Sequence, residues 1–166
     1  ILLGETREEL GGSEYLAVVH KRKAGRPPRV DLAGESALQQ LMLTLTAQGW
    51  LKSAHDCSEG GLAVALAECC IMEPLHLIGA TVSFTTPNIR SDALLFGESS
   101  GRIVASCQRY HVERIEHLAA RHKVAMAVVG RVGGARLRFD PWLEVPVDEL
   151  NEAWRSALPK ALGAVG

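Results

Sequence analysis

Apolar segments of two different periods alternate along the chain, and this alternation limits the possible folds more than any other feature. Residues 78–84 and 103–107 alternate apolar with polar or small side chains, which is the two-residue period of a strand. Residues 34–48 and 112–122 place apolar side chains three or four positions apart, which indicates amphipathic helices. The mixture predicts an α+β fold.

The middle of the chain is expected to follow a known motif. Between residues 51 and 132 the expected order is strand, helix, strand, strand, helix, strand, which is ferredoxin-like. The continuously apolar residues 124–129 are typical of a central strand buried on both faces. A closing helix begins near residue 147, and Pro159 should distort or end it. We therefore predict one mixed sheet with helices on both faces, a three-layer α/β/α arrangement.

Charge and cysteine usage exclude several functional classes. The 166 residues carry 18 Lys+Arg and 19 Asp+Glu, a net charge of -1, whereas a nucleic-acid binder normally carries a clear basic excess. Apolar runs are too short to span a membrane. The four cysteines form no C-x-x-C pair and suit buried thiols of a reducing compartment. We expect a cytoplasmic protein with no nucleic-acid or membrane partner and no metal site.

Two features near the N-terminus concern the relation of this chain to a longer protein and to possible partners. The sequence opens on Ile1 instead of Met, so we expect a single domain, residues 1–166, cut from a longer multidomain protein. Residues 20–29 read HKRKAGRPPR and hold five Lys or Arg and two prolines. This composition predicts an exposed loop, with an anion or partner contact as the functional alternative.

A strand expected at residues 51–55 is joined to a helix expected at residues 59–72 by polar residues and two glycines. Asp56 or Ser58 can cap the helix, and the glycines allow a ligand or another backbone to approach. Free N–H groups and the helix dipole would favour an anion such as phosphate. The alternative is a plain capped turn, with His55 in a structural, hydrogen-bonded role. The ligand candidates here are Asp56, Ser58, Gly60 and Gly61.

Residues 97–102 match the G-x-S-x-G nucleophile elbow of serine hydrolases. That elbow needs a helix after the serine, whereas residues 102–107 alternate like a strand. We therefore expect no nucleophilic role for Ser99, and no catalytic residue is predicted in the chain. The segment is either an exposed turn or a recognition loop, in which Glu98, Ser99 and Arg102 are ligand candidates because Arg suits phosphate or carboxylate.

Four motifs together resemble one enzyme family, phosphoribosylformylglycinamidine synthase. They are LGGSEY at residues 10–15, HDCSEGGLAVALAE at 55–68, LFGESSGRIV at 95–104 and the closing VDELNEAWRSALPKAL. They occur in the family's order and span nearly the whole chain. The departures are modest: Cys57 and Glu59 replace the usual Val and Asp, and Ser100-Gly101 replaces a commoner Gln-Ser pair.

The resemblance implies the C-terminal domain, of the aminoimidazole-ribonucleotide-synthetase type, of an ATP-dependent carbon–nitrogen ligase of purine biosynthesis. Such a ligase converts formylglycinamide ribonucleotide to the amidine with ATP, Mg²⁺ and ammonia derived from glutamine. The family's catalytic His and Mg²⁺ carboxylates lie upstream, so the fragment alone is expected to be inactive. The implied partners are the upstream domains and a glutaminase subunit or domain.

Two other interpretations stay open. The chain could be a non-catalytic scaffold that holds a structural nucleotide or contacts the glutaminase, or it could belong to a related aminoimidazole ribonucleotide synthetase-type enzyme. An unpartnered sheet face would leave an exposed apolar patch, through which the fragment is expected to form a homodimer.

Overall fold

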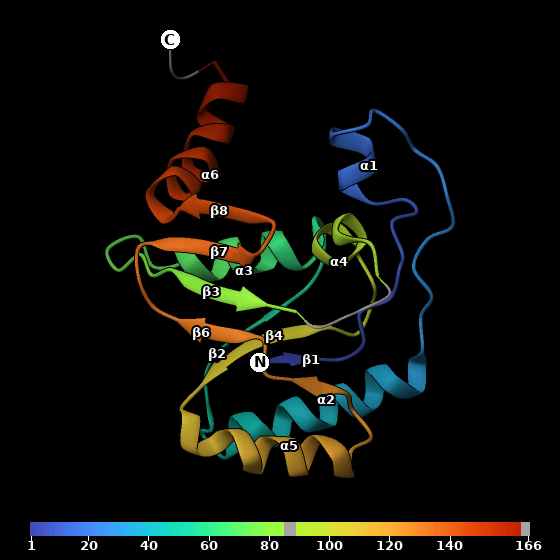
Figure 1. The fold of residues 1–166 in the computed structure, drawn as a ribbon. Helices are drawn as coiled ribbons and strands as arrows, with labels where there is room; N and C mark the ends of the chain where they lie inside the picture. The colour runs from blue at the N-terminus through green and yellow to red at the C-terminus, as the bar shows by residue number, and fades with distance from the viewer. Residues whose placement is uncertain (85–88, 164–166) are drawn as a thin grey trace. The chain divides into compact units, whose positions relative to one another are not determined.

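The computed structural model describes residues 1–84 and 89–163, and the chain divides into two compact units. Unit 1 comprises residues 1–65 and 85–129, and unit 2 comprises residues 66–84 and 130–166. Each unit holds its own four-stranded sheet (Figure 1). Within the described ranges, the search for a helix long and apolar enough to cross a membrane finds none.

The sheet of unit 1 is antiparallel, in the order β2-β4-β1-β5. Its strands are β1 (Leu2–Leu3), β2 (Leu51–Asp56), β4 (Ile103–Cys107) and β5 (Met126–Ala127). Two helices, α2 (Leu32–Ala47) and α5 (Val112–Arg121), place their apolar stripes in the same core as β1. The buried members of this core are Leu3, Leu38, Leu41, Leu45, Ile115 and Ala119.

Asp31 is the N-cap of α2, and its Oδ1 accepts hydrogen bonds from the N–H groups of Ala33 and Gly34 at 3.1 and 3.2 Å. Such a cap satisfies N–H groups that have no partner inside the helix. The first helix of this unit, α1 (Glu14–Val18), has Ser13 as its N-cap, whose hydroxyl accepts a hydrogen bond from the N–H of Leu16. The rings of Tyr15 in α1 and Phe96 in α4 (Ser91–Phe96) stack at 4.7 Å, so these two short helices are held side by side.

The sheet of unit 2 is mixed, in the order β6-β3-β7-β8. Its strands are β3 (Ala80–Ser83), β6 (Gly130–Val132), β7 (Arg136–Asp140) and β8 (Leu143–Pro146), and α6 (Val147–Ala161) follows directly. Of the pairs described in this sheet, β3–β7 is parallel, and β3–β6 and β7–β8 are antiparallel. Alternation along β3 and β7 buries one face, which consists of Ala80, Val82, Leu137 and Phe139. The remaining elements are α3 (Gly61–Ile71) and a 3₁₀ turn at Arg109–His111.

The α+β class is confirmed, but the strands are divided between two sheets and do not form one. The expected ferredoxin-like order fails because α4 separates β3 from β4 and because β3 pairs with β7 instead. The predicted central strand at residues 124–129 is also wrong. Only two of those residues form β5, an edge strand, and Val128 beside it is 62% exposed.

The helix at the C-terminal side runs further than expected. Pro159 lies inside α6, which continues to Ala161. The proline stands in the last turn of the helix, so it removes one backbone hydrogen bond close to an end that is already incomplete.

Candidate functional site

The two loops singled out by their sequence meet in unit 1 through their backbones. Gly60 and Gly61 link β2 to α3 with φ angles of 78° and 68°, a conformation in which side chains are strained. A Cβ on Gly61 would lie 2.5 Å from the carbonyl oxygen of Gly97, so there is no room for one. Gly61 is therefore required by the packing of one loop on the other, whereas a Cβ on Gly60 would meet the side chain of Val64.

The side chain of Glu98 connects three segments of unit 1 through hydrogen bonds. Its Oε1 accepts one hydrogen bond from the N–H of Gly60 and another from the N–H of Glu14, both at 2.9 Å. The N–H of Gly61 donates to the carbonyl oxygen of Ser58 at 3.0 Å. The N–H groups that the glycine pair could offer to a phosphate are thus engaged within the chain, and a carboxylate already lies at one of them.

We expect Glu98→Ala to destabilise unit 1 by about 2 kcal/mol, because two backbone N–H groups lose a charged acceptor. Glu98→Gln keeps an acceptor oxygen and should cost about 1 kcal/mol or less. Urea unfolding followed by circular dichroism measures both. Glu59→Ala, at an exposed neighbouring acid, is the matched control. An equal loss in the Gln and Ala variants would show that the acceptor contacts are not the cause.

Asp56 and Ser58 form the accessible part of the site. The Asp56 side chain is 72% exposed, and the Ser58 hydroxyl donates a hydrogen bond to its carboxylate. This hydrogen bond is the main reason why the pKa of Asp56 is lowered, and neighbouring His55 acts in the same direction. The Nδ1–H of His55 donates to the carbonyl oxygen of Asp56 at 2.7 Å. The pair therefore presents an ionised carboxylate to solvent.

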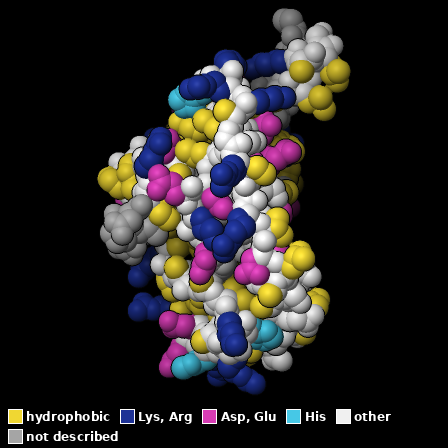
Figure 2. Space-filling model, turned by 90° about the vertical axis from the view of Figure 1, so that its right-hand side faces the viewer, with side chains coloured by type: hydrophobic (Ala, Val, Ile, Leu, Met, Phe, Trp, Pro, Cys, Tyr) yellow, Lys and Arg dark blue, Asp and Glu magenta, His cyan; other side chains and the backbone are white. Residues whose placement is uncertain are grey.

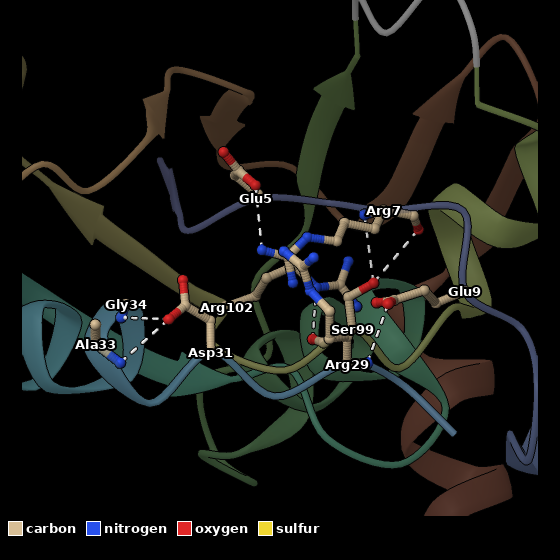
Figure 3. A network of polar contacts seen from close by, with 9 residues as sticks. All are labelled: Glu5, Arg7, Glu9, Arg29, Asp31, Ala33, Gly34, Ser99 and Arg102. Carbon is tan, nitrogen blue, oxygen red and sulfur yellow. Dashed lines mark hydrogen bonds and ion pairs between the residues drawn. The ribbon is translucent and has the colours of Figure 1, made fainter. Parts of the chain in front are cut away.

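Ser99 and Arg102 are buried, with exposed fractions of 0% and 2%. The Ser99 hydroxyl donates to the carbonyl of Arg7 and accepts from its N–H, both at 3.3 Å (Figure 3). Arg102 donates to the carbonyl oxygens of Ser99 and Gly97 and to the hydroxyl of Thr6. Every partner that the structure gives these two side chains belongs to the chain itself, so their contact with a ligand stays a prediction.

The charged guanidinium of Arg102 is buried away from solvent. Burial lowers the pKa of its guanidinium, and neighbouring Cys57 and Glu9 oppose that shift. Figure 3 shows Glu9 beside the Ser99–Arg102 group, and its Oε1 accepts a hydrogen bond from the N–H of Arg29. The sequence did not mark Thr6, Arg7 or Glu9 as parts of this region, because each acts through a contact with residues about 20 to 100 positions away.

A small cavity of about 120 Å³ lies in unit 1 beside the second loop. Gly101 and Ser100 line it from the loop, and Arg7 and Lys123 contribute cations. Its lining acids are Glu5, Asp31 and Glu35. A search of the described ranges finds no group of three His, Cys, Asp or Glu side chains that could hold a metal ion.

Comparisons with known proteins place this arrangement in a family. The chain is 44% identical over 168 aligned residues to the phosphoribosylformylglycinamidine synthase subunit PurL of Anaeromyxobacter dehalogenans, and 34% identical to that of Methanocaldococcus jannaschii. These alignments cover 97% and 98% of the chain but 22% of each relative. The chain thus spans about a fifth of the length of the curated relatives that it matches.

Solved structures show the same fold at lower identity. PurL of Thermotoga maritima in complex with FGAR superposes with a TM-score of 0.75 at 22% identity, over 91% of this chain and 27% of that one. A chain of the HypE–HypF complex gives a TM-score of 0.56 at 16% identity, over 88% of this chain and 51% of that one. The family described as AIR synthase related protein, C-terminal domain, matches residues 1–140. Because that match extends over most of its length, the chain belongs to the family of AIR synthase related C-terminal domains.

Proposed function

We propose that the chain is the C-terminal domain of an ATP-dependent ligase that converts formylglycinamide ribonucleotide to formylglycinamidine ribonucleotide in purine biosynthesis. The observation that carries this proposal is 44% identity to a phosphoribosylformylglycinamidine synthase subunit over 97% of the chain. The solved complexes of Thermotoga maritima PurL with ATP and with FGAR have the same fold. They support the proposal that the longer protein binds these two ligands. Residues 1–166 would then be one domain at the end of a longer protein.

The chemistry of this reaction sets what the domain has to provide. ATP supplies the phosphoryl group that activates the amide oxygen, and ammonia then displaces phosphate. In the described ranges no group of three His, Cys, Asp or Glu side chains could hold a metal ion, and we propose that the reacting groups lie in the rest of the longer protein. This domain would bind and orient one end of a ligand and would not act alone.

Within the domain, we assign ligand contact first to Asp56 and Ser58. The exposed carboxylate accepts a hydrogen bond from the Ser58 hydroxyl, which lowers its pKa, and a carboxylate of this kind also accepts hydrogen bonds from sugar hydroxyls. The backbone at Gly60 and Gly61 lies beside this pair and would line the same contact. Direct binding of a phosphate at these glycines requires that Glu98 releases the N–H of Gly60.

A second candidate is a scaffold role, in which the loops complete a core and bind nothing. The burial of Ser99 and Arg102 favours this alternative for the loop at residues 97–102, because neither side chain is accessible to a ligand. Under it, Glu98, Ser99 and Arg102 serve only to hold the loops of unit 1 in place, and no ligand contacts either loop.

We further propose a cytoplasmic location and a glutaminase subunit or domain as the source of ammonia. The solved PurLQS assembly of Thermotoga maritima supports a partner of this kind. We also propose that the isolated chain forms a homodimer through an exposed apolar face. Leu75, Leu158 and Leu162 of unit 2 lie outside the strands and are 86%, 67% and 73% exposed, and exposed apolar side chains of this kind support it.

The test is turnover by the longer synthase that ends in this domain. We expect Asp56→Asn to raise KM for formylglycinamide ribonucleotide by about tenfold or more, because a charged acceptor is lost. Glu116→Gln, at an exposed acid of α5, should leave KM unchanged. Unchanged kinetics in both variants would favour the scaffold role, and turnover by the isolated chain would contradict the assignment as an incomplete fragment.

A further inference from the structure

A cluster of unpaired positive charge lies on the connection between α1 and α2. This segment, residues 20–29, is called the basic loop. It holds five of the 18 Lys and Arg of the chain, so the other residues carry 13 against 19 Asp and Glu. All five are exposed, and none forms an ion pair with a residue in the described ranges. They are Lys21, Arg22, Lys23, Arg26 and Arg29.

The backbone of the basic loop is held in place at three points. The N–H of Arg22 donates to the carbonyl oxygen of Leu16, and the N–H of Gly12 donates to that of Ala24, both at 3.0 Å. The N–H of Arg29 donates to Glu9 Oε1 at 3.0 Å. Between these points the loop packs on a glycine, because a Cβ at Gly25 would lie 2.7 Å from the Cα of Gly11. The charges are therefore presented on a fixed backbone.

Aliphatic side chains border the basic loop at both ends. Val18 and Val19 precede it and are each 59% exposed, and Val30 and Leu32 follow it at 59% and 80%. The loop lies at the right of Figure 1, and Figure 2 turns that side to the viewer and shows basic side chains with apolar ones among them. Apolar contacts beside charged ones are the usual composition of a protein–protein interface.

From these observations we infer that the basic loop and its aliphatic borders form a docking surface for a protein partner that presents acidic side chains around an apolar spot. Cations that form no ion pair in the described ranges, carried on a backbone that is held in place, are complementary to such a surface and speed association with it. This inference goes beyond the proposed ligase activity and does not depend on it.

Other anionic partners fit the surface less well. The loop contains no Phe, Tyr or Trp on which a base could stack, and its His20 ring lies edge-on to Tyr15 at 5.1 Å. The acidic excess of the remaining residues also opposes a long polyanion or an anionic membrane. None of the loop residues lines the cavity of unit 1, which argues against a small ligand.

The experiment measures binding of a fluorescent peptide of about 20 residues, in which Glu-Glu pairs alternate with single Leu residues, to the full chain. We expect affinity to fall as ionic strength rises, and R22Q/K23Q/R26Q to weaken binding by about tenfold or more. R109Q/R114Q/R121Q removes three exposed cations elsewhere in unit 1 and should change affinity by less than about twofold. L32Q should weaken binding by about threefold or more.

Several outcomes would overturn the inference. Equal losses in the two triple variants would show that only net charge matters. Tighter binding of a single-stranded oligonucleotide of equal charge, or of phosphatidylserine vesicles, would assign the surface to those partners instead. Peptide binding that is absent in the wild type, or insensitive to salt, would also overturn it. Circular dichroism and thermal unfolding of each variant establish that the fold is retained.

Discussion

Replacing Gly61 with alanine is expected to destabilise the chain by about 3 kcal/mol or more, the combined cost of a left-handed backbone and of a clash with another backbone. The φ of Gly61 is 68°, and its Cβ would lie 2.5 Å from the carbonyl oxygen of Gly97. Gly97 cannot yield easily. Its N–H donates to the carbonyl oxygen of Ala93 at 2.9 Å, and its own carbonyl oxygen accepts from Arg102.

Gly49 provides a matched control for this substitution. Its φ of 64° is nearly the same, and an added Cβ would meet nothing within 4 Å. Gly49→Ala should therefore cost only the backbone strain, about 1 kcal/mol. The free energies of unfolding in urea give the comparison. If both variants lose the same stability, the close approach of the two loops does not contribute.

Local patterns in the sequence predicted the helices and strands far better than their pairing. The spacing of Leu38, Leu41 and Leu45 predicted α2, and these are the residues that enter the core. Period-two alternation predicted β3 and β4 in the same way. Alternation does not encode which strand lies next to which, so the division into two sheets could not be read from it. A continuously apolar run, such as residues 124–129, also fits an edge strand whose neighbours cover it only in part.

The candidate site shows the same division between local and distant information. The strand, the glycine pair and the helix that build the turn after Asp56 are local, and each was expected. The bond from Gly60 to Glu98 joins residues 38 positions apart, and the loops' backbone contact has no local signature. Arginine is almost never fully buried unless paired, so the sequence favoured an accessible Arg102 that could contact a ligand. The structure buries it among carbonyl oxygens instead.

Arg102→Ala is the variant that best separates a structural from a ligand-binding role for this loop. Removal of the guanidinium leaves the buried carbonyl oxygens of Ser99 and Gly97 without their donor, at a cost of about 1–3 kcal/mol each. We therefore expect a loss of about 3 kcal/mol or more, measured by urea unfolding. Arg102→Lys keeps the charge but lacks the planar fork that reaches several acceptors, so it should recover only part of that loss.

The control is Arg131→Ala, at an exposed arginine of β6, which should change stability by less than about 0.5 kcal/mol. A structural role also predicts that the kinetics of the longer synthase change in parallel with the loss of folded protein as temperature rises. A ligand contact predicts the opposite combination, in which Arg102→Ala is as stable as the wild type and KM rises at every temperature. Since Arg102 is buried and its guanidinium donates to the carbonyl oxygens of Ser99 and Gly97, we expect the first result.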